Sequence, residues 1–513
     1  MSYKKSIAAL LFVIFFIKAS SQSSLPRSTP EAEGVVSKNI IQFLDAAGEG
    51  KTEFHSFMML RHGKVVAEGW WNPYSADLKH TLYSTSKSFT ATAIGFAVSE
   101  KLLSVDDKVV SFFPNDLPDT VSSFLSALTV KNVLSMSDGQ EPDPTGAVVA
   151  RDSNWVKGFL STPILHYPGT QFLYNSLGTY MLAAIVQKVT GQKVIDYLKP
   201  RLFGPLGIEG EDWETDAGGI NTGGWGLRLK TEDMAKFGQL FLQKGNWNGK
   251  QIIPASWVEE ATSAKILQDP DAPQSKRDSS DWLQGYCYQM WRCRNEAYRG
   301  DGAFGQYIII IPKKDAVVAI TAETPDMQEE INLIWKYLLP ALHDEALPAD
   351  AAALSRLKEK LASLALPLPA STSASSVQKT LTGKTFKMQP NEKNIQSISF
   401  KFNGDVCYAT ITDTAAHTFA FGLGKWVRST TTMHGPNLVA GAKNNLNGLP
   451  AFVTDGAYRW VDNKTLALTL RFTESPHAYT YVCSFDGKKV NVNIKTSFYF
   501  GKGDISLAGE TAR

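Results

Sequence analysis

The chain has 513 residues, and its 52 lysines and arginines against 50 aspartates and glutamates give a net charge of +2. This length exceeds that of one ordinary domain, so we expect two. The charges are balanced and no dense basic run lies beside aromatic clusters, which argues against a nucleic-acid partner.

The N-terminus has the pattern of a signal peptide. Two lysines precede an apolar run from Ile7 to Ile17, and the small residues Ala19-Ser20-Ser21 suit cleavage before Gln22. The run is too short for a permanent membrane span. We therefore predict that residues 1–21 are removed and that the protein is periplasmic or secreted, with an uncleaved anchor as the alternative.

Residues 22–345 mix helical and strand patterns. Phe57 to Glu68 has the pattern of a hairpin with its turn at His62-Gly63. This region is predicted to be α+β, a helical body with an antiparallel sheet. The other expected elements are a helix from Ser84, a helix over Thr179–Thr190 ended by Gly191, a helix capped by Thr231, and strands over Gly285–Trp291, Gln306–Ile311 and Ala316–Thr321.

Composition changes after His343. Residues 346–377 are predicted to form a short helix and a linker rich in proline, serine and alanine. Residues 378–513 contain two strong hairpin signals, at Asn403-Gly404 and Asp486-Gly487. We predict a separate all-β domain, either a small barrel or a sandwich.

The four cysteines do not predict a disulfide framework. Cys287 and Cys293 fall in one expected extended segment, where six residues span roughly 20 Å, beyond the about 7 Å that a bridge allows. Cys407 and Cys483 both fall in the β-rich region and could pair.

The tetrapeptide Ser84-Thr85-Ser86-Lys87 is the strongest functional signal. Three other serines, Ser2, Ser355 and Ser376, also have a lysine three residues on, but they lack its setting. The segment Phe89 to Val98 is apolar nearly all round, so a helix here is expected to be buried.

A serine and a lysine at positions i and i+3 of a buried helix can act as nucleophile and base. Desolvation favours the neutral amine of Lys87, which can then accept the proton of Ser84. The N–H groups of the helix N-terminus would stabilise an oxyanion. The plainer alternative is a serine N-cap followed by a lysine that reaches the surface.

Two downstream segments can complete such a site. Tyr174 follows a Pro-Gly turn, and nearby cations could lower its pKa so that it relays protons to the leaving group. The alternative for Tyr174 is an interface tyrosine with its hydroxyl in water. Three glycines between Gly300 and Gly305 precede a strong strand and suggest an edge strand that offers the Ala303 N–H to an oxyanion, although a plain hairpin loop fits as well.

Other catalytic plans lack their motifs. The chain has no Gly-x-Ser-x-Gly elbow and no His-Glu-x-x-His, so no metal or other cofactor is predicted. The pairs Gly218-Gly219 and Gly223-Gly224 lack the lysine of a phosphate loop and are expected to form a wall of the cleft.

Five segments of the chain form a specific series. They are Leu82 to Phe89, Leu128 to Gly139, Pro168 to Ser176, Leu229 to Gly238 and Gly300 to Gln306. With these segments in this order, the region from about Leu25 to His343 resembles the serine β-lactamase-related family, which includes class C β-lactamases, DD-peptidases, family VIII esterases and 6-aminohexanoate-dimer hydrolases. The resemblance implies a β-lactamase/transpeptidase-like domain.

The resemblance implies a role for each residue of the motif. Ser84 would be the acylated nucleophile, Lys87 its base and Tyr174 the shared acid and base. The N–H groups of Ser84 and Ala303 would form the oxyanion hole. The tail from about Val377 resembles, in strand pattern alone, the lipocalin-like domains attached to such hydrolases.

Two departures from the family narrow the expected substrate. Gly300-Asp301-Gly302 stands where β-lactamases have Lys-Thr-Gly, so the lysine that would meet a carboxylate is missing and Asp301 adds a negative charge. Penicillin-like anions are therefore expected to bind poorly. The order Tyr174-Asn175-Ser176 replaces Tyr-x-Asn, as in the hexanoate-dimer-hydrolase-like branch. We expect substrate contacts from Gly300, Asp301, Gly302, Asn175 and Ser176.

The sequence therefore predicts an exported serine hydrolase that cleaves small esters or amides through an acyl-enzyme on Ser84. Alternatives are a D-amino acid peptidase, a weak β-lactamase, or a penicillin-binding-like sensor that is acylated without turnover. A sensor of this kind would be marked in the sequence by the loss of Lys87 or Tyr174. Both residues are present, which argues against it.

Overall fold

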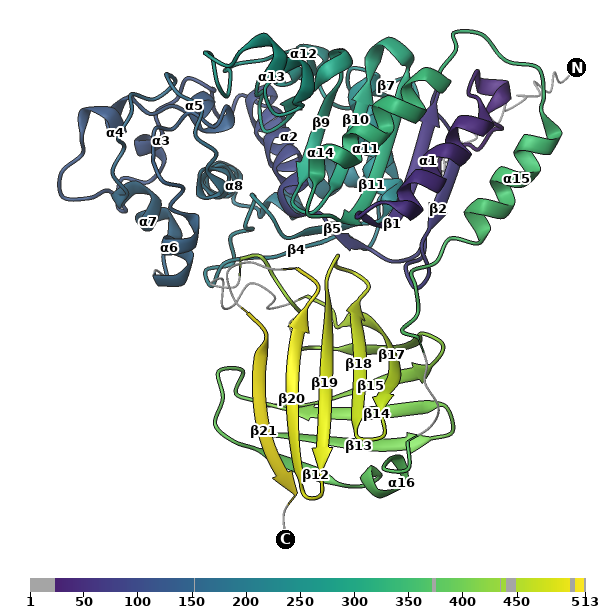
Figure 1. The fold of residues 1–513 in the computed structure, drawn as a ribbon. Helices are drawn as coiled ribbons and strands as arrows, with labels where there is room; N and C mark the ends of the chain where they lie inside the picture. Colours follow the sequence, from purple (N-terminus) through teal and green to yellow (C-terminus); the bar gives the residue numbers. More distant parts are fainter. Residues whose placement is uncertain are drawn as a thin grey trace, which may run out of the picture.

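The structure is a computed structural model that describes residues 24–151, 153–370, 375–433, 435–439, 449–498 and 503–511. The predicted signal peptide lies outside the described residues. An antiparallel sheet with helices on both faces forms the first part of the chain, and a β-barrel forms the second (Figure 1). None of the described helices is long and apolar enough to cross a membrane.

The first sheet has the strand order β2-β1-β11-β10-β9-β8. Its hairpin β1–β2 turns at His62-Gly63, where both residues have positive φ, as predicted. β1 pairs along its length with β11, from Glu53 opposite Glu323 to Arg61 opposite Ala316. The strands are β1 (Glu53–Arg61), β2 (Lys64–Trp70), β8 (Trp291–Arg292), β9 (Tyr298–Gly302), β10 (Gln306–Ile311) and β11 (Ala316–Glu323).

Side chains alternate between the two faces of the sheet along each strand, and both faces are buried because helices cover each of them. Met58 and Leu60 face one core with α2, α8 and α11, whereas Phe57 and Met59 face a second core with α1 and α15. The bounds of these helices are α1 (Ser37–Glu49), α2 (Ser86–Ser99), α8 (Ser176–Thr190), α11 (Thr231–Leu242), α14 (Met327–Leu333) and α15 (Ala351–Ala362).

Shorter elements complete the helical body. The short helices are α3 (Val109–Phe112), α4 (Ser123–Ala127), α5 (Val130–Leu134), α6 (Thr145–Arg151), α7 (Trp155–Ser161), α9 (Val194–Leu198), α10 (Gly204–Leu206), α12 (Ala255–Thr262), α13 (Gln274–Ser279) and, before the barrel, α16 (Gln378–Leu381). The short strands are β3 (His80–Thr81), β4 (Asp212–Trp213), β5 (Leu227–Leu229), β6 (Asn246–Trp247) and β7 (Lys250–Gln251).

Two predicted elements differ from the structure. Gly285 to Met290 is a loop, and of the predicted strand only Trp291 belongs to one, as the first residue of β8, because Gly285 and Gln289 have positive φ and the Gln289 amide donates to the carbonyls of Val133 and Leu134. Helix α11 begins at Thr231 with Lys230 as its N-cap residue. The Thr231 hydroxyl donates instead to Ser56, which ties the helix to β1.

The C-terminal barrel confirms the predicted all-β region. Both predicted hairpins form, with their turns one residue later than predicted, at Gly404-Asp405 and Gly487-Lys488, because Asn403 and Asp486 still pair within the strands. Among the described residues nine strands close the barrel where β15 pairs in parallel with β17, and β16 adds to β17. The strands are β12 (Thr385–Met388), β13 (Ser397–Asn403), β14 (Val406–Thr412), β15 (Ala416–Leu423), β16 (Val427–Thr431), β17 (Phe452–Asp462), β18 (Thr465–Phe472), β19 (Ala478–Asp486), β20 (Lys489–Thr496) and β21 (Ile505–Thr511).

All four cysteines are buried and free, so the possible pair Cys407–Cys483 is not formed.

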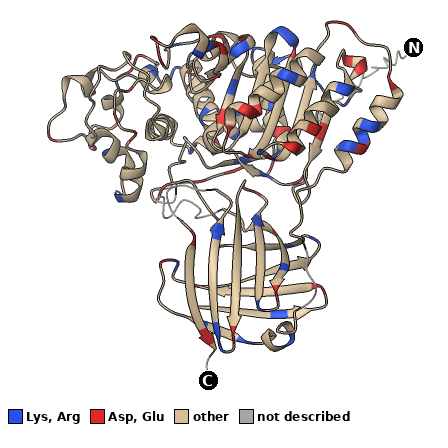
Figure 2. Cartoon of the chain, viewed as in Figure 1, with Lys and Arg blue, Asp and Glu red and all other residues tan. Residues whose placement is uncertain are grey.

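Basic and acidic residues are interspersed over both parts of the chain in the view of Figure 2. The domain limits predicted from the sequence stay predictions. One end of the barrel packs against the first sheet, where Arg471 forms two hydrogen bonds with Glu53 of β1.

Candidate active site

Ser84 lies where the predicted buried helix begins. It sits in the 3₁₀ turn Tyr83–Thr85, which continues directly into α2. Every residue of α2 from Ser86 to Ala97 is buried, because apart from Lys87 the helix carries only apolar or small uncharged side chains there and packs against α8. Ser84 itself, unlike the helix that follows, is partly exposed.

Lys87 is one turn further along, with its side chain 1% exposed. Its Nζ lies 3.2 Å from Ser84 Oγ, 3.0 Å from Ser176 Oγ and 2.8 Å from the carbonyl oxygen of Gly224. Burial lowers the pKa of Lys87 to about 7, and the charges of Asp143 and Asp301 only partly oppose this. A neutral amine keeps a lone pair that can accept the Ser84 proton while Gly224 accepts one of its N–H bonds.

Tyr174 lies beside the same pair, in the loop before α8. Its ring stacks on Trp291 with 5.8 Å between centroids, and Lys87 Nζ is 5.0 Å from the ring centroid. The expectation that cations lower its pKa is wrong: burial raises the pKa of Tyr174 well above its usual value, and the charge of Asp301 adds to this rise. The Ser84 hydroxyl opposes the rise only in part, so Tyr174 keeps its proton at neutral pH.

The two residues after Tyr174 differ in their contacts. Asn175 is fully buried as the N-cap of α8: its Oδ1 accepts from Gly178 N and its Nδ2 donates to Gln140. Both polar ends of the Asn175 side chain are bonded within the protein. Asn175 therefore caps the helix, and it does not offer the substrate contact that the sequence predicted. The Ser176 hydroxyl, in contrast, accepts a hydrogen bond from Lys87 and so lies in the cluster of Ser84 and Lys87.

Strand β9 lies against the turn that holds Ser84. A Cβ on Gly302 would come within 2.2 Å of the Leu82 carbonyl oxygen, and one on Gly300 within 3.2 Å of Thr85. The glycines therefore serve this close approach between strand and turn. Ala303 follows directly, partly exposed, and its N–H has no hydrogen-bond partner among the residues that the structure describes.

Asp301 does not present a free negative charge. Its carboxylate lies 2.8 Å from the guanidinium of Arg299, which is fully buried one alternation back on the same face of β9. Burial raises the pKa of Asp301, and Arg299 opposes this. The predicted repulsion of anionic substrates by Asp301 is therefore weakened by its partner.

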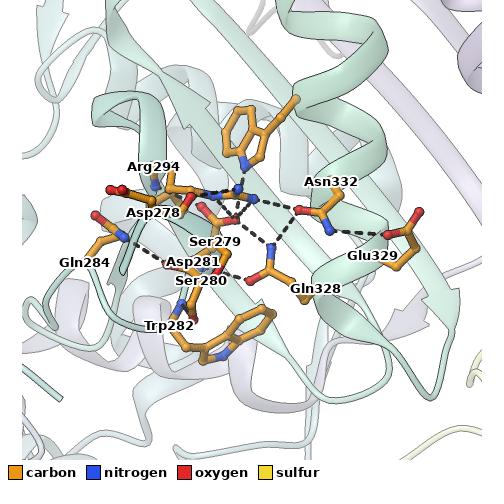
Figure 3. Close-up of polar contacts among 12 residues, drawn as sticks. Asp278, Ser279, Ser280, Asp281, Trp282, Gln284, Arg294, Gln328, Glu329 and Asn332 are labelled. Carbon is orange, nitrogen blue, oxygen red and sulfur yellow. Dashed lines mark hydrogen bonds and ion pairs between the residues drawn. The ribbon is translucent and has the colours of Figure 1, made fainter. Parts of the chain in front are cut away.

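Arg299 is itself held by the segment around Asp281. Figure 3 shows this segment, with polar contacts from Asp281 to Arg294 and Gln328. Arg299 Nη1 donates to the carbonyl oxygen of Asp281, and its guanidinium stacks over the Trp282 ring. The Asp281 carboxylate is fully buried and accepts from Arg294, Gln328 and Trp335. Through Asp281, this hydrogen-bond network connects Arg299 of β9 to Gln328 of helix α14.

The sequence predicted that Ser84, Lys87 and Tyr174 lie together, but it missed the roles of Gly224 and Arg299. It left Gly224 as part of a cleft wall, although its carbonyl oxygen accepts from Lys87. Arg299 could have been found, because its spacing of two from Asp301 places both on one face of a strand. Among the described residues no group of three His, Cys, Asp or Glu side chains could hold a metal ion.

Comparison with known proteins places this geometry in a family. The 6-aminohexanoate-dimer hydrolase of Paenarthrobacter ureafaciens is 27% identical over 289 residues, 53% of this chain and 73% of that protein. A structure from Bacillus anthracis assigned as a 6-aminohexanoate-dimer hydrolase has the same fold, with a TM-score of 0.52 and 24% identity over 63% of this chain and 89% of its own.

An octameric penicillin-binding protein homologue from Pyrococcus abyssi aligns over 92% of this chain and 99% of its own, at 17% identity and a TM-score of 0.47. The model of the beta-lactamase family matches residues 41–341. Because this match spans more than half of the sequence and includes Ser84, Lys87 and Tyr174, the chain belongs to the beta-lactamase family.

Proposed function

We propose that this protein is a serine hydrolase that cleaves small esters or amides through an acyl-enzyme on Ser84. One observation carries the proposal: a fully buried lysine with a pKa of about 7 lies 3.2 Å from the hydroxyl of a partly exposed serine. Burying a lysine costs free energy, and its placement beside a reactive hydroxyl is typical of an activated nucleophile.

In the acylation step, Lys87 takes the proton of Ser84 as Oγ attacks the carbonyl carbon of the substrate. The carbonyl oxygen becomes an oxyanion that the N–H groups of Ser84 and Ala303 stabilise. Tyr174, which keeps its proton, gives it to the leaving oxygen or nitrogen as the carbon–heteroatom bond breaks, and Lys87 returns a proton to Tyr174. The net transfer is one proton from Ser84 to the leaving group.

Deacylation runs the same route with water as nucleophile. Water loses a proton through Tyr174 to Lys87 while its oxygen attacks the acyl carbon, and that proton returns to Ser84 as the ester bond breaks. The pair of Tyr174 and Lys87 thus serves both half-reactions.

The substrate is proposed to lack an essential carboxylate next to the scissile bond. No lysine stands at Gly300, and Arg299, the residue before it, is buried and already paired with Asp301. The preference over penicillin-like anions rests on this missing free cation rather than on repulsion by Asp301. The likeness to a 6-aminohexanoate-dimer hydrolase supports a linear amide as one substrate class.

Two further parts of the proposal rest on the sequence. The N-terminal pattern supports export to the periplasm or the medium. The strand pattern of the tail supports a lipocalin-like domain that modulates access to the site.

A fluorophosphonate probe tests the reaction type. It should label the wild-type protein and not the Ser84→Ala variant. Ser355→Ala is the matched control, because Ser355 also precedes a lysine by three residues but lies exposed on α15. Equal labelling of wild type and Ser84→Ala would refute the proposal. Nitrocefin turnover as fast as that of a short p-nitrophenyl ester would refute the substrate preference.

A further inference from the structure

The barrel reaches the candidate active site through the loop between β18 and β19. His477, the last residue of this loop, is fully buried against the first sheet. It contacts Tyr83, which directly precedes Ser84, and Phe304, which directly follows Ala303. One side chain from the C-terminal barrel therefore touches the chain neighbours of both proposed oxyanion-hole residues.

Both of these neighbours have an unusual backbone conformation. Tyr83 has φ 46° and Phe304 has φ 67°, in the left-handed region that residues other than glycine rarely adopt. Such conformations persist only where surrounding contacts hold them. The Ser84 N–H lies in the peptide plane that begins at Tyr83, and Phe304 is joined to Ala303 by the next peptide bond, so both conformations constrain the backbone beside these N–H groups.

Hydrogen bonds fix His477 between the two parts of the protein. Its Nδ1 lies 2.7 Å from a carboxylate oxygen of Glu323, the last residue of β11. A carboxylate only accepts, so Nδ1–H donates to Glu323 and the neutral ring accepts at Nε2 from the Tyr83 hydroxyl, 2.5 Å away. Burial lowers the pKa of His477, which favours this neutral form.

Ring packing holds the second neighbour. The rings of Phe304 and His477 meet edge to face with 4.7 Å between centroids, and Phe304 also packs against Tyr83 at 5.6 Å. The carbonyl oxygen of Phe304 accepts from Thr324 N, one residue beyond Glu323. Tyr83, Phe304 and His477 thus form one buried cluster whose members converge from the Ser84 turn, the end of β9 and the barrel.

We propose that His477 is a positioning residue that holds the N–H groups of Ser84 and Ala303 in the geometry of the oxyanion hole, so that the barrel completes the active site. This inference rests on the proposed function. The physical reason is preorganisation: donors that are fixed before the reaction stabilise the oxyanion more than donors that must reorient.

Another contact across the same interface provides a matched control. The Tyr74 hydroxyl donates to the carbonyl oxygen of Ser475, in the same barrel loop, at 3.1 Å. Tyr74 is as buried as Tyr83 but stacks on His55 instead of adjoining the nucleophile. Tyr74→Phe and Tyr83→Phe therefore each remove one buried tyrosyl hydroxyl from the same interface.

The test uses the full-length protein, a short p-nitrophenyl ester and a phenylboronic acid as transition-state analogue. Tyr83→Phe and His477→Ala should lower kcat by about ten- to a hundredfold with KM changed less than about twofold. The boronic acid should bind more weakly by the same factor as kcat/KM falls. Tyr74→Phe should keep kcat within about twofold of wild type.

Equal kcat values for Tyr83→Phe and Tyr74→Phe would overturn the inference, even if both variants lose thermal stability, because the cluster would then be only an interface contact. Such a result leaves the proposed function standing, since the wild type still turns over the ester. A wild type that neither turns over the ester nor reacts with a fluorophosphonate would overturn the proposed function and this inference together.

Discussion

Replacing Lys87 with methionine should abolish hydrolysis. It should also change the unfolding free energy, because it removes a buried titratable group from the native state. The side chain of methionine is unbranched and apolar, so it can occupy the space of the lysine stem. The effect on stability depends on pH, because the pKa of Lys87 falls from its ordinary 10.5 to about 7 on folding.

The magnitude follows from proton linkage. Between pH 7 and pH 10.5 the unfolded chain binds the Lys87 proton and the native state does not, so this group makes the wild type less stable as the pH falls. Each pH unit in this window is worth about 1.4 kcal/mol. The penalty is therefore about 4 kcal/mol at pH 7 and about 2 kcal/mol at pH 9. The lost hydrogen bond to Gly224 costs the variant about 1–3 kcal/mol at both pH values.

Urea unfolding at pH 7 and pH 9 measures the difference in unfolding free energy between Lys87→Met and wild type. The advantage of the variant should shrink by about 2 kcal/mol from pH 7 to pH 9. Lys358→Met, which removes an exposed lysine from α15, is the control for loss of a lysine charge. A difference between Lys87→Met and wild type that is the same at both pH values would refute the lowered pKa of Lys87.

Three further predictions concern the same region. The pH profile of kcat/KM for an uncharged ester should rise with a midpoint near pH 7 as Lys87 loses its proton, and it should show no fall below about pH 10, because the pKa of Tyr174 is raised; a fall between pH 7 and 9 would contradict this. Glu330→Met should stabilise the fold, because burial raises the pKa of this carboxyl and neither of its oxygens has a partner among the described residues. The gain should grow as the pH rises above about 4.5, where the unfolded chain ionises, and a gain that is constant from pH 4 to pH 8 in thermal unfolding would speak against it. Asp301→Asn should lower the unfolding free energy by about 3 kcal/mol, because it leaves the buried Arg299 guanidinium without its partner, and urea unfolding that is unchanged would show that the pair is not needed.

Local patterns predicted the parts of the structure that local chemistry controls. The spacing of Ser84 and Lys87 and the apolar run after them were enough to predict a buried helix with both groups on one face, and the structure has it. The turn at His62-Gly63 was predictable, and the hairpin after Asn403 was predictable to within one residue, because His62, Gly63 and Gly404 adopt positive φ. These features depend on residues close together in the chain.

Contacts between distant residues were not predictable in this way. Asn175 could be a helix cap or a substrate ligand by sequence alone, and only the placement of Gln140 decides for the cap. The loop around Gln289 has an extended-strand composition, but hydrogen bonds to α5 bend it. The role of His477 has no local signal, because Glu323 and Tyr83, the partners of its two ring nitrogens, lie more than 150 residues away in the chain.

The central claim is that catalysis proceeds through a covalent ester on Ser84. Rapid quenching of the wild type during turnover of p-nitrophenyl butyrate, followed by peptide mass spectrometry, tests it directly. The account predicts one butyryl group on the peptide that contains Ser84, formed as fast as the first turnover and absent from Ser84→Ala. Turnover with no acylated peptide, or with the butyryl group on another residue, would contradict the account.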